Sequence, residues 1–410
     1  MVTSLPVPAS LQKQIRYTGK TAPALALIVG VLLVGFLLGA MWMDHSRATM
    51  LPAPTGSYAV GRVTFDWRDP VRVDPLAPEA GTKRELAAWI WYPAERNPTL
   101  QTADYMPASW RNAMEGGWFI TLMNRDPSRV RAHSLQDAAV SGEQKQYPVV
   151  LMRPGLAALT TNYTSLVEDL ASHGYVVVGF DAPYRSMVTV FPDGRVMSRT
   201  QQNNLDLVGD AEQKSLANEL MQDWVADTSF ALDKLGELNS SDPAGRFTGR
   251  LDMQRVGMFG HSLGGATALQ FCHDDVRCKA GIDVDGLPLG SVVADGIAKP
   301  FMFLMSDHSG ESGVEKRQVM GDFQRIYDRL PPDGRWMITL RTANHYGFSD
   351  DTKSHVVMGV MHTLGRMMNG PRQIEISERY IDAFFDVYLK GAPVSELKGG
   401  AGYAEVEVGR

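Results

Sequence analysis

Short apolar runs alternate with longer amphipathic stretches along most of the chain. A strand covered on both faces is apolar at nearly every position, whereas a helix that packs on a sheet is apolar on one side only. The runs that predict buried strands are Tyr147–Met152, Tyr175–Phe180, Arg255–Phe259, Ala280–Asp285, Pro300–Met305 and Trp336–Arg341. Helices are predicted over Tyr163–His173, Leu205–Leu238 and Glu378–Lys390. This order predicts a mostly parallel sheet with helices on both faces.

The segment before these strands has a different pattern. Ser57–Asp69 and Arg84–Tyr92 alternate polar and apolar residues, which predicts two antiparallel strands. Residues 95–145 look irregular and contain an apolar patch, Trp110–Met123. This patch would insert into a bilayer, line a pocket for an acyl chain, or pack on the core as a flap. Since no linker divides residues 57–395, we predict one domain there, followed by a C-terminal tail over 396–410.

The N-terminal region contains an apolar stretch without any charge over Thr21–Met43. Its twenty residues Ala24–Met43 would span about 30 Å as a helix, the thickness of a bilayer core. A cleaved signal peptide is the alternative, but its apolar region is usually about 7–15 residues long. The sequence Met41-Trp42-Met43 is also a poor cleavage site. We therefore predict an uncleaved signal anchor, a transmembrane helix over residues 21–43.

Basic residues before this span set its predicted orientation. Lys13, Arg16 and Lys20 precede it, and no acidic residue lies among the first twenty positions. Positive charge is retained on the cytoplasmic side. The prediction is a cytoplasmic tail over residues 1–20, the anchor over 21–43, a linker over 44–56, and an exported domain, periplasmic or extracellular, after the linker. If the segment were cleaved, the domain would be secreted.

Charge and cysteine content exclude several classes of partner. The net charge of −6, without any Lys/Arg-rich block, does not fit a nucleic-acid-binding protein. The two cysteines, Cys272 and Cys278, lack further ligands for a zinc site, and no metal or organic cofactor is expected. In an exported domain they are predicted to form a disulfide, with two buried thiols as the alternative. The oligomeric state is not indicated.

The stretch Gly260-His261-Ser262-Leu263-Gly264 follows a predicted buried strand and precedes a helix rich in small residues. This context fits the nucleophile elbow G-x-S-x-G of the α/β-hydrolase fold, in which the serine stands on a tight turn at the carboxyl edge of the sheet. A serine hydroxyl needs a histidine base that is oriented by a carboxylate. We therefore predict Ser262 as a nucleophile.

The chain order of this fold is serine, acid, histidine. Asp283 and Asp285 point the same way along one predicted strand, and we prefer Asp285 because it lies at the strand end. Of nine histidines, His345 directly follows the last predicted strand and is the predicted base. His308 follows the strand before that one and is not chosen, and His355 and His362 lie in a predicted helical stretch.

Attack on a carbonyl also requires backbone N–H groups that stabilise the developing oxyanion. One is the amide after the nucleophile, Leu263. The second comes from the turn after an earlier strand, Pro154-Gly155-Leu156, where we choose Leu156 with Ala157 as the neighbouring alternative. These choices complete a predicted site for covalent serine catalysis.

Several stretches resemble the plasma-type (group II) platelet-activating-factor acetylhydrolases. They are RPGLAALTTNYTSLVEDLASHGYVVVGFDAPYRS, GRLDMQRVGMFGHSLGGATA, KAGIDVDGLPLG and TANHYGFSD, together with the IWYPA strand and the closing FFDVYL helix. The resemblance covers most of residues 57 to 391. It implies an α/β-hydrolase fold and an esterase in which Ser262, Asp285 and His345 match the triad and Leu156 matches an oxyanion donor.

The resemblance further implies hydrolysis of short or oxidised sn-2 acyl chains of phospholipids, an activity like that of a 1-alkyl-2-acetylglycerophosphocholine esterase, through an acyl-enzyme. Polyester, xenobiotic-ester or amide hydrolases of this fold would use the same residues, whereas a binding protein without activity would normally lack one of them. Arg153-Pro154 stands where the animal enzymes have a Ser-His-like pair. This difference and the predicted anchor affect the expected lipid specificity, not the expected hydrolysis.

Overall fold

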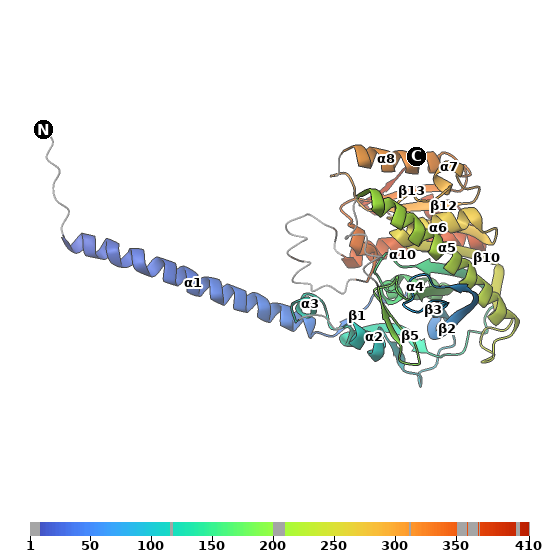
Figure 1. Cartoon of the computed structure of the whole chain (residues 1–410), viewed down its shortest axis with the longest axis horizontal. Helices are drawn as coiled ribbons and strands as arrows, with labels where there is room; N and C mark the ends of the chain where they lie inside the picture. Colours follow the sequence, from blue (N-terminus) through green and yellow to red (C-terminus); the bar gives the residue numbers. More distant parts are fainter. Residues whose placement is uncertain are drawn as a thin grey trace.

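The computed structural model describes residues 9–114, 118–199, 210–310, 313–350, 359, 368, 370–398 and 402–409. Within these residues, a 12-stranded sheet runs through the protein (Figure 1). Its centre consists of parallel strands in the order β7-β6-β10-β11-β12-β13. Their bounds are Tyr147–Arg153 (β6), Val176–Asp181 (β7), Leu251–His261 (β10), Cys278–Val284 (β11), Phe301–Met305 (β12) and Arg335–Leu340 (β13). The predicted parallel sheet is confirmed.

Two long antiparallel strands, β2 (Ala59–Val73) and β3 (Lys83–Ala94), extend this centre beyond β7, as predicted. The expectation that residues 95–145 are irregular is wrong. They contain β4 (Thr102–Asp104), α2 (Ala108–Ala113), α3 (Trp118–Met123), a short 3₁₀ turn (Pro127–Arg129) and β5 (Val130–Gln136). The strand β5 forms because its alternate buried residues pack on the core while its backbone pairs with β1, β2 and β4.

Short strands also come from segments predicted to be a linker and a tail. β1 (Thr49–Met50) pairs with β5, and β14 (Val406–Val408) pairs with β13 at the other end of the sheet. A separate hairpin consists of β8 (Val188–Val190) and β9 (Val196–Ser198). Pairing of such two- and three-residue strands depends on the neighbouring strand, so their own residues do not predict them.

Helices cover both faces of the sheet (Figure 1). Along β6, Val150 and Met152 pack in one hydrophobic cluster with α4 and α10, whereas Val149 and Leu151 pack in a second cluster with α5, α6 and α8. This separation follows from the alternation of side chains along a strand. The helices are α4 (Thr164–Ser172), α5 (Asp210–Ser240), α6 (Leu263–Asp274), α7 (Val292–Asp295), α8 (Val314–Tyr327), α10 (Gly370–Lys390) and α11 (Ser395–Lys398). His355 and His362 lie outside the described residues.

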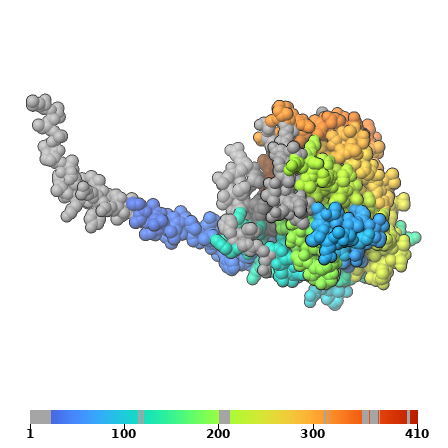
Figure 2. All heavy atoms as spheres, viewed as in Figure 1, coloured from blue at the N-terminus to red at the C-terminus, as the bar shows by residue number. Residues whose placement is uncertain are grey.

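The N-terminal helix α1 (Ala9–His45) projects away from the rest of the protein (Figures 1 and 2). Its portion Pro23–His45 has a mean hydropathy of 2.7 and is long and apolar enough to cross a bilayer, a property that signal sequences share. The end of α1 is joined to the domain, because the carbonyl of Asn124 lies 2.7 Å from His45 Nδ1 and the amide of Asp126 donates to the carbonyl of His45.

The strand order reverses between β6 and β10. β6 connects through α4 to β7 on one side, whereas β10 connects through α6 to β11 on the other. Arg153 at the end of β6 is in register with Gly260 of β10. In open α/β sheets a crevice forms at the carboxyl ends of the strands where the order reverses. The turn after β6 and the residue Ser262 after β10 therefore meet at this crevice.

Candidate active site

Ser262 lies on the sharp turn between β10 and α6. Its backbone has φ 57° and ψ −122°, a positive-φ conformation that is costly for a residue with a side chain. A Cβ on Gly260 would collide with the backbone of Gly264, and a Cβ on Gly264 would collide with the backbones of Arg153 and Pro154. Glycine is therefore needed on both sides of Ser262, as in a nucleophile elbow.

Asp285 is the first residue after β11 and lies next to this turn. The amide of Ser262 donates to the carbonyl of Val284 at 2.9 Å, so the two chain segments are joined just before Asp285. The Asp285 carboxylate is fully shielded from solvent, and its Oδ2 lies 2.7 Å from Nδ1 of His345. His345 opens the 3₁₀ turn His345–Phe348 after β13 and is about one-third exposed. Ser262, Asp285 and His345 line one cavity.

A second imidazole contacts the same carboxylate. His308 Nε2 lies 2.9 Å from Asp285 Oδ1, while Ser306 donates its amide to Oδ1 at 2.7 Å and its hydroxyl to Oδ2 at 2.8 Å. Burial raises the pKa of Asp285, but the hydrogen bonds from His308, His345 and Ser306 lower it more, and the net pKa lies well below the usual range. His308 was not among the predicted site residues, because its only signal in the sequence is its place after a strand end.

Asp283 occupies a different environment from Asp285. It lies within β11, and its Oδ1 accepts the amide of Gly286 at 2.8 Å. Asp283 Oδ2 is buried and has no hydrogen-bond partner among the described residues. Burial raises the pKa of Asp283 well above its usual range. The structure thus places Asp285, and not Asp283, against His345.

A chain of hydrogen bonds connects the turn after β6 to His345 through His261. The amide of Gly155 donates to the Tyr163 hydroxyl at 3.1 Å, which lies 2.7 Å from His261 Nδ1. His261 Nε2 lies 2.8 Å from the carbonyl of His345. Burial, and then the nearby His345, lower the pKa of His261 to about 3, so the ring is neutral. A carbonyl only accepts, so Nε2 donates to it and the tyrosine hydroxyl donates to Nδ1.

One predicted oxyanion donor lies in the turn after β6, and the other directly follows Ser262 in the chain. Gly155 is in close contact with Ser262, because a Cβ at Gly155 would lie 3.2 Å from the Ser262 Cβ. Leu156 follows in the same turn, and Ala157 after it has φ 61°. Leu263 is the first residue of α6, so its amide lies outside the hydrogen-bond pattern of the helix and near its positive end.

The cavity above Ser262 has a volume of about 530 Å³. Its polar lining residues include Asp285, His308, Lys316 and His345. Its apolar lining residues are Leu287, Met305, Val319, Met320 and Phe323. A cavity of this size with a few polar groups is typical of small-molecule binding sites.

Comparison with known proteins places this site in a family. Residues 43–386 match the family model of platelet-activating factor acetylhydrolase, isoform II. The chain belongs to this family. It is 25% identical to a platelet-activating factor acetylhydrolase of Bos taurus, over 87% of this chain and 83% of the relative. It is 24% identical to a probable 1-alkyl-2-acetylglycerophosphocholine esterase of Arthroderma benhamiae, over 91% of this chain and 97% of the relative.

A solved structure has a similar fold. The ferulic acid esterase from Streptomyces cinnamoneus superimposes with a TM-score of 0.70 at 25% identity, covering 88% of this chain and all of that one. The named relatives and this structure are carboxylic ester hydrolases, and the acetylhydrolase-family protein described here is one as well. The predicted α/β-hydrolase fold is thereby confirmed.

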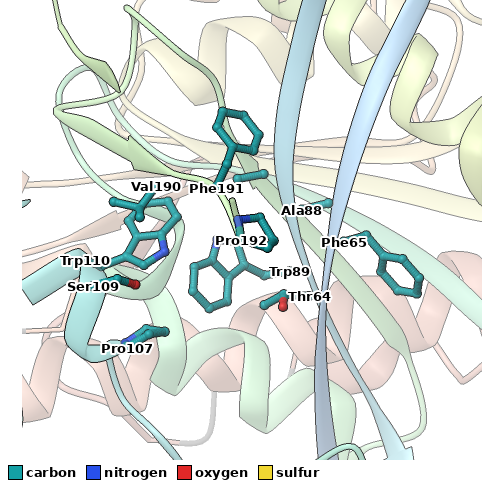
Figure 3. Close-up of a pocket in the computed structure, with 11 residues that line it drawn as sticks. Thr64, Phe65, Ala88, Trp89, Pro107, Ser109, Trp110, Val190, Phe191 and Pro192 are labelled. Atoms are coloured by element: carbon teal, nitrogen blue, oxygen red, sulfur yellow. The ribbon is translucent and has the colours of Figure 1, made fainter. Parts of the chain in front are cut away.

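The patch Trp110–Met123 of this family member divides into two parts. Trp110 is buried and packs edge-on against Trp89 with ring centroids 5.3 Å apart. The two rings face a small apolar pocket of about 190 Å³, lined also by Val190 and Pro192 (Figure 3). α3 lies instead beside the end of α1, with Trp118 exposed. Residues 115–117 lie outside the described residues.

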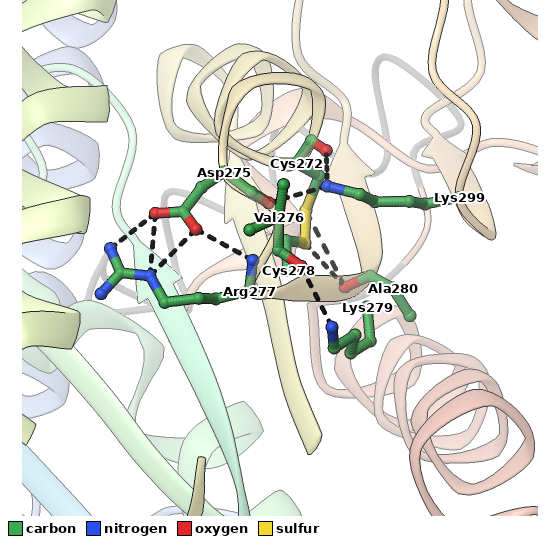
Figure 4. The surroundings of a disulfide bond; sticks show 8 residues. All are labelled: Cys272, Asp275, Val276, Arg277, Cys278, Lys279, Ala280 and Lys299. Atoms are coloured by element: carbon green, nitrogen blue, oxygen red, sulfur yellow. Dashed lines mark hydrogen bonds and ion pairs between the residues drawn. A yellow bond between two sulfur atoms is a disulfide. The ribbon is translucent and has the colours of Figure 1, made fainter. Parts of the chain in front are cut away.

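The two cysteines lie away from Ser262. Cys272 in the last turns of α6 and Cys278 at the start of β11 are joined as a disulfide, with Cα atoms 5.1 Å apart (Figure 4). The intervening turn is held by Arg277, whose guanidinium contacts Asp275. Whether the bridge forms in the cell stays a prediction that depends on export.

Proposed function

We propose that this protein is a serine esterase in which Ser262 is the nucleophile, His345 the general base and Asp285 the residue that orients His345. One observation carries the proposal. Ser262, on its strained turn, lines the same cavity as His345, and the His345 imidazole is hydrogen-bonded to the buried, ionised carboxylate of Asp285. Leu156 and Leu263 are the proposed oxyanion donors. The reaction needs no metal ion and no organic cofactor.

The proposed reaction has two steps. His345 Nε2 accepts the hydroxyl proton of Ser262 as Oγ attacks the acyl carbonyl carbon. The ester C–O bond breaks, the alcohol leaves with the proton from His345, and the acyl group stays on Ser262. A water molecule then attacks the acyl group while His345 accepts its proton. The carboxylic acid is released and the Ser262 hydroxyl is restored.

The substrate we propose is a phospholipid with a short or oxidised sn-2 acyl chain. The family match and the fungal relative, whose name specifies a 2-acetyl glycerophosphocholine ester, support this class. The apolar residues that line the cavity fit an acyl or alkyl chain, and the polar residues, Lys316 among them, fit a charged head group. The ferulic acid esterase neighbour supports a second candidate, an aromatic or polymeric ester.

A substrate panel tests the proposal. Initial rates are measured for p-nitrophenyl esters of increasing chain length, for 2-acetyl and 2-palmitoyl phosphatidylcholines, and for methyl ferulate. We expect the 2-acetyl phospholipid to be cleaved at least about tenfold faster than the 2-palmitoyl form. A higher kcat/KM for methyl ferulate would favour the second candidate. Equal, very low rates for all esters would contradict the esterase assignment.

The variant Ser262→Ala tests the nucleophile. It should retain only a small residual rate from binding and the oxyanion donors. Ser240→Ala, at the end of α5, is the matched control and should keep wild-type activity. A fluorophosphonate should label wild-type protein on the peptide that contains Ser262, and labelling of another serine would contradict the assignment.

We also propose that residues 21–43 anchor the protein in a membrane with residues 1–20 in the cytoplasm and the catalytic domain, residues 57–395, exported. The apolar portion of α1 and the three basic residues before it support this topology. Sequencing of the mature N-terminus tests it. A new terminus near Ala40 would show cleavage and secretion, and an intact terminus with a protease-accessible domain in spheroplasts would support the anchor.

A further inference from the structure

Two buried carboxylates and one imidazole meet between α4 and α10. They are Asp169 in α4, His173 at its C-terminal end and Asp382 in α10. One ligand atom from each lies within 4.8 Å of the others. α4 starts at the carboxyl edge of the sheet and runs back between parallel strands, so its end lies at the opposite edge from Ser262. This cluster is therefore separate from the cavity described above.

The spacing of these atoms suits a tetrahedral metal ion. Zinc binds imidazole nitrogen and carboxylate oxygen at about 2.0–2.2 Å, which places neighbouring ligand atoms about 3.3–3.6 Å apart. His173 Nε2 lies 3.5 Å from Asp382 Oδ2 and 4.0 Å from Asp169 Oδ2. Small side-chain movements would thus bring all three atoms to bonding distance. A mixed nitrogen and oxygen donor set favours Zn²⁺ over Ca²⁺ or Mg²⁺, which prefer oxygen alone.

Asp169 presents an unsatisfied oxygen to this position. Its side chain is almost completely buried, and Oδ1 accepts the amide of Thr55 at 2.6 Å and its hydroxyl at 3.0 Å. Oδ2, the atom that faces His173, is buried and has no hydrogen-bond partner among the described residues. A buried carboxylate oxygen without a partner is costly, and a bound cation would remove this cost.

The charge around the cluster also favours a cation. Within the described ranges, no lysine or arginine forms an ion pair with Asp169 or Asp382, although Asp382 is itself buried. Glu378 and Asp386 lie on the same helix, and Lys390 pairs with Asp386 at 2.9 Å. Apart from His173, these two acids have no basic ion-pair partner among the described residues, and the nearby Lys390 donates instead to the carbonyl of His173 at 2.7 Å.

We propose that Asp169, His173 and Asp382 bind one Zn²⁺ ion through Asp169 Oδ2, His173 Nε2 and Asp382 Oδ2, with water as the fourth ligand. His173 is about 29% exposed, which provides a route from solvent. In the metal-free form Nε2 lies 2.9 Å from the Thr55 hydroxyl, and the ion would replace this contact. Asp169 and His173 lie four residues apart on α4, but Asp382 comes from α10, so the complete ligand set is not visible in the local sequence.

The site would fasten the segment after α1 to the domain. Thr55 holds Asp169, and the next residues are tied to α4 because Gly56 donates to the Ser172 hydroxyl at 2.9 Å and Tyr58 donates to the Ser172 carbonyl at 3.0 Å. An ion that fixes Asp169 to α10 therefore stabilises the junction between the linker and the catalytic domain. This role is structural and is independent of the proposed esterase activity.

Thermal unfolding of the full chain in detergent tests the proposal. Protein stripped with EDTA and dialysed is titrated with ZnCl₂ alone, and the melting temperature is followed by intrinsic fluorescence. We expect a rise of roughly 3–6 °C at a hundredfold excess of Zn²⁺ over Kd. Isothermal calorimetry should give one site per chain. An unchanged melting temperature and no heat of binding would overturn the proposal.

Two variants and one control make the result specific. His173→Asn and Asp382→Asn should fold, and each should weaken Zn²⁺ binding at least about tenfold. His273 lies near the exposed acids Asp274 and Asp295, so His273→Asn is the matched control and should bind Zn²⁺ like the wild type. Binding that persists in His173→Asn, or is lost only in His273→Asn, would show that the ion binds elsewhere.

Discussion

Replacing Asp285 with asparagine tests the proposed triad most directly. The Asp285 carboxylate accepts four hydrogen bonds: two from Ser306, one from His308 and one from His345, with donor–acceptor distances of 2.7–2.9 Å. The Ser306 amide can only donate. The oxygen of an asparagine would therefore face that amide at the Oδ1 position, and its NH₂ group would take the Oδ2 position next to His345.

This exchange changes the tautomer of His345. An NH₂ group beside Nδ1 donates a hydrogen bond to it, so the proton of the neutral ring moves to Nε2. Nε2 is then unable to accept the proton of Ser262. In a serine triad, the same carboxylate-to-amide change lowers turnover about 10⁴-fold, which corresponds to about 5 kcal/mol of transition-state stabilisation. We expect Asp285→Asn to lower kcat/KM by a factor of this order.

Asp283→Asn is the matched control. Burial raises the pKa of Asp283, and among the described residues its hydrogen-bond partner is the Gly286 amide, a contact that an asparagine oxygen keeps. We expect a change in kcat/KM below about tenfold. Both variants are assayed with p-nitrophenyl acetate at several pH values, and their melting temperatures are compared to exclude misfolding. If Asp283→Asn is folded and more damaging than Asp285→Asn, the assignment of the acid is wrong.

Three further predictions concern His308, the disulfide and Glu378. The kcat/KM of His308→Gln should stay within about threefold of the wild-type value. His308→Phe loses one charge-assisted hydrogen bond to Asp285, and its kcat/KM should be about tenfold lower. Equal values of kcat/KM for the two variants would refute a role of His308 in holding Asp285. The double variant Cys272→Ala/Cys278→Ala should lose about 2–3 kcal/mol in the free energy of unfolding and keep its activity. Mass spectrometry of unreduced exported protein tests the bridge itself, and free thiols would refute it. Burial, and then the charge of Asp169, raise the pKa of Glu378 in the folded protein to about 9, above its unfolded value. The folded protein therefore favours the protonated carboxyl, and the free energy of unfolding falls as pH rises from about 4.5 to 9. The free energy of unfolding in urea should therefore rise for Glu378→Gln, relative to wild type, by about 2–4 kcal/mol between about pH 5 and pH 8. Parallel pH profiles of the two proteins would contradict this.

Much of the central sheet was predictable because several of its strands are buried on both faces. β6, β7 and β12 are buried at every position, and their nearly continuous apolar runs are visible without any partner. β1, β4 and β14 have two or three residues each and exist only because a neighbouring strand supplies hydrogen bonds. Local pattern cannot reveal such pairings. The same limit explains the error in residues 95–145.

The candidate site was predictable where chain order and local turns determine it. The glycines around Ser262 and the position of His345 after the last parallel strand are such features. The contact of His308 with Asp285 and the hydrogen bonds of His261 depend on loops that meet only in the folded protein. The link of His261 to the His345 carbonyl and to Tyr163 required the structure.

The choice between Asp283 and Asp285 shows how backbone geometry decides a chemical role. In an ideal strand the two side chains would share one face and one environment. β11 ends at Val284, and Asp285 has φ 52°, so its side chain leaves that face and reaches His345 and His308. Asp283 remains on the strand, beneath α6, where a Cβ on Gly265 would collide with its Oδ1. Two residues apart, hydrogen-bond donors lower the pKa of one carboxyl while burial raises the pKa of the other, and only an ionised carboxyl can orient an imidazole for proton transfer.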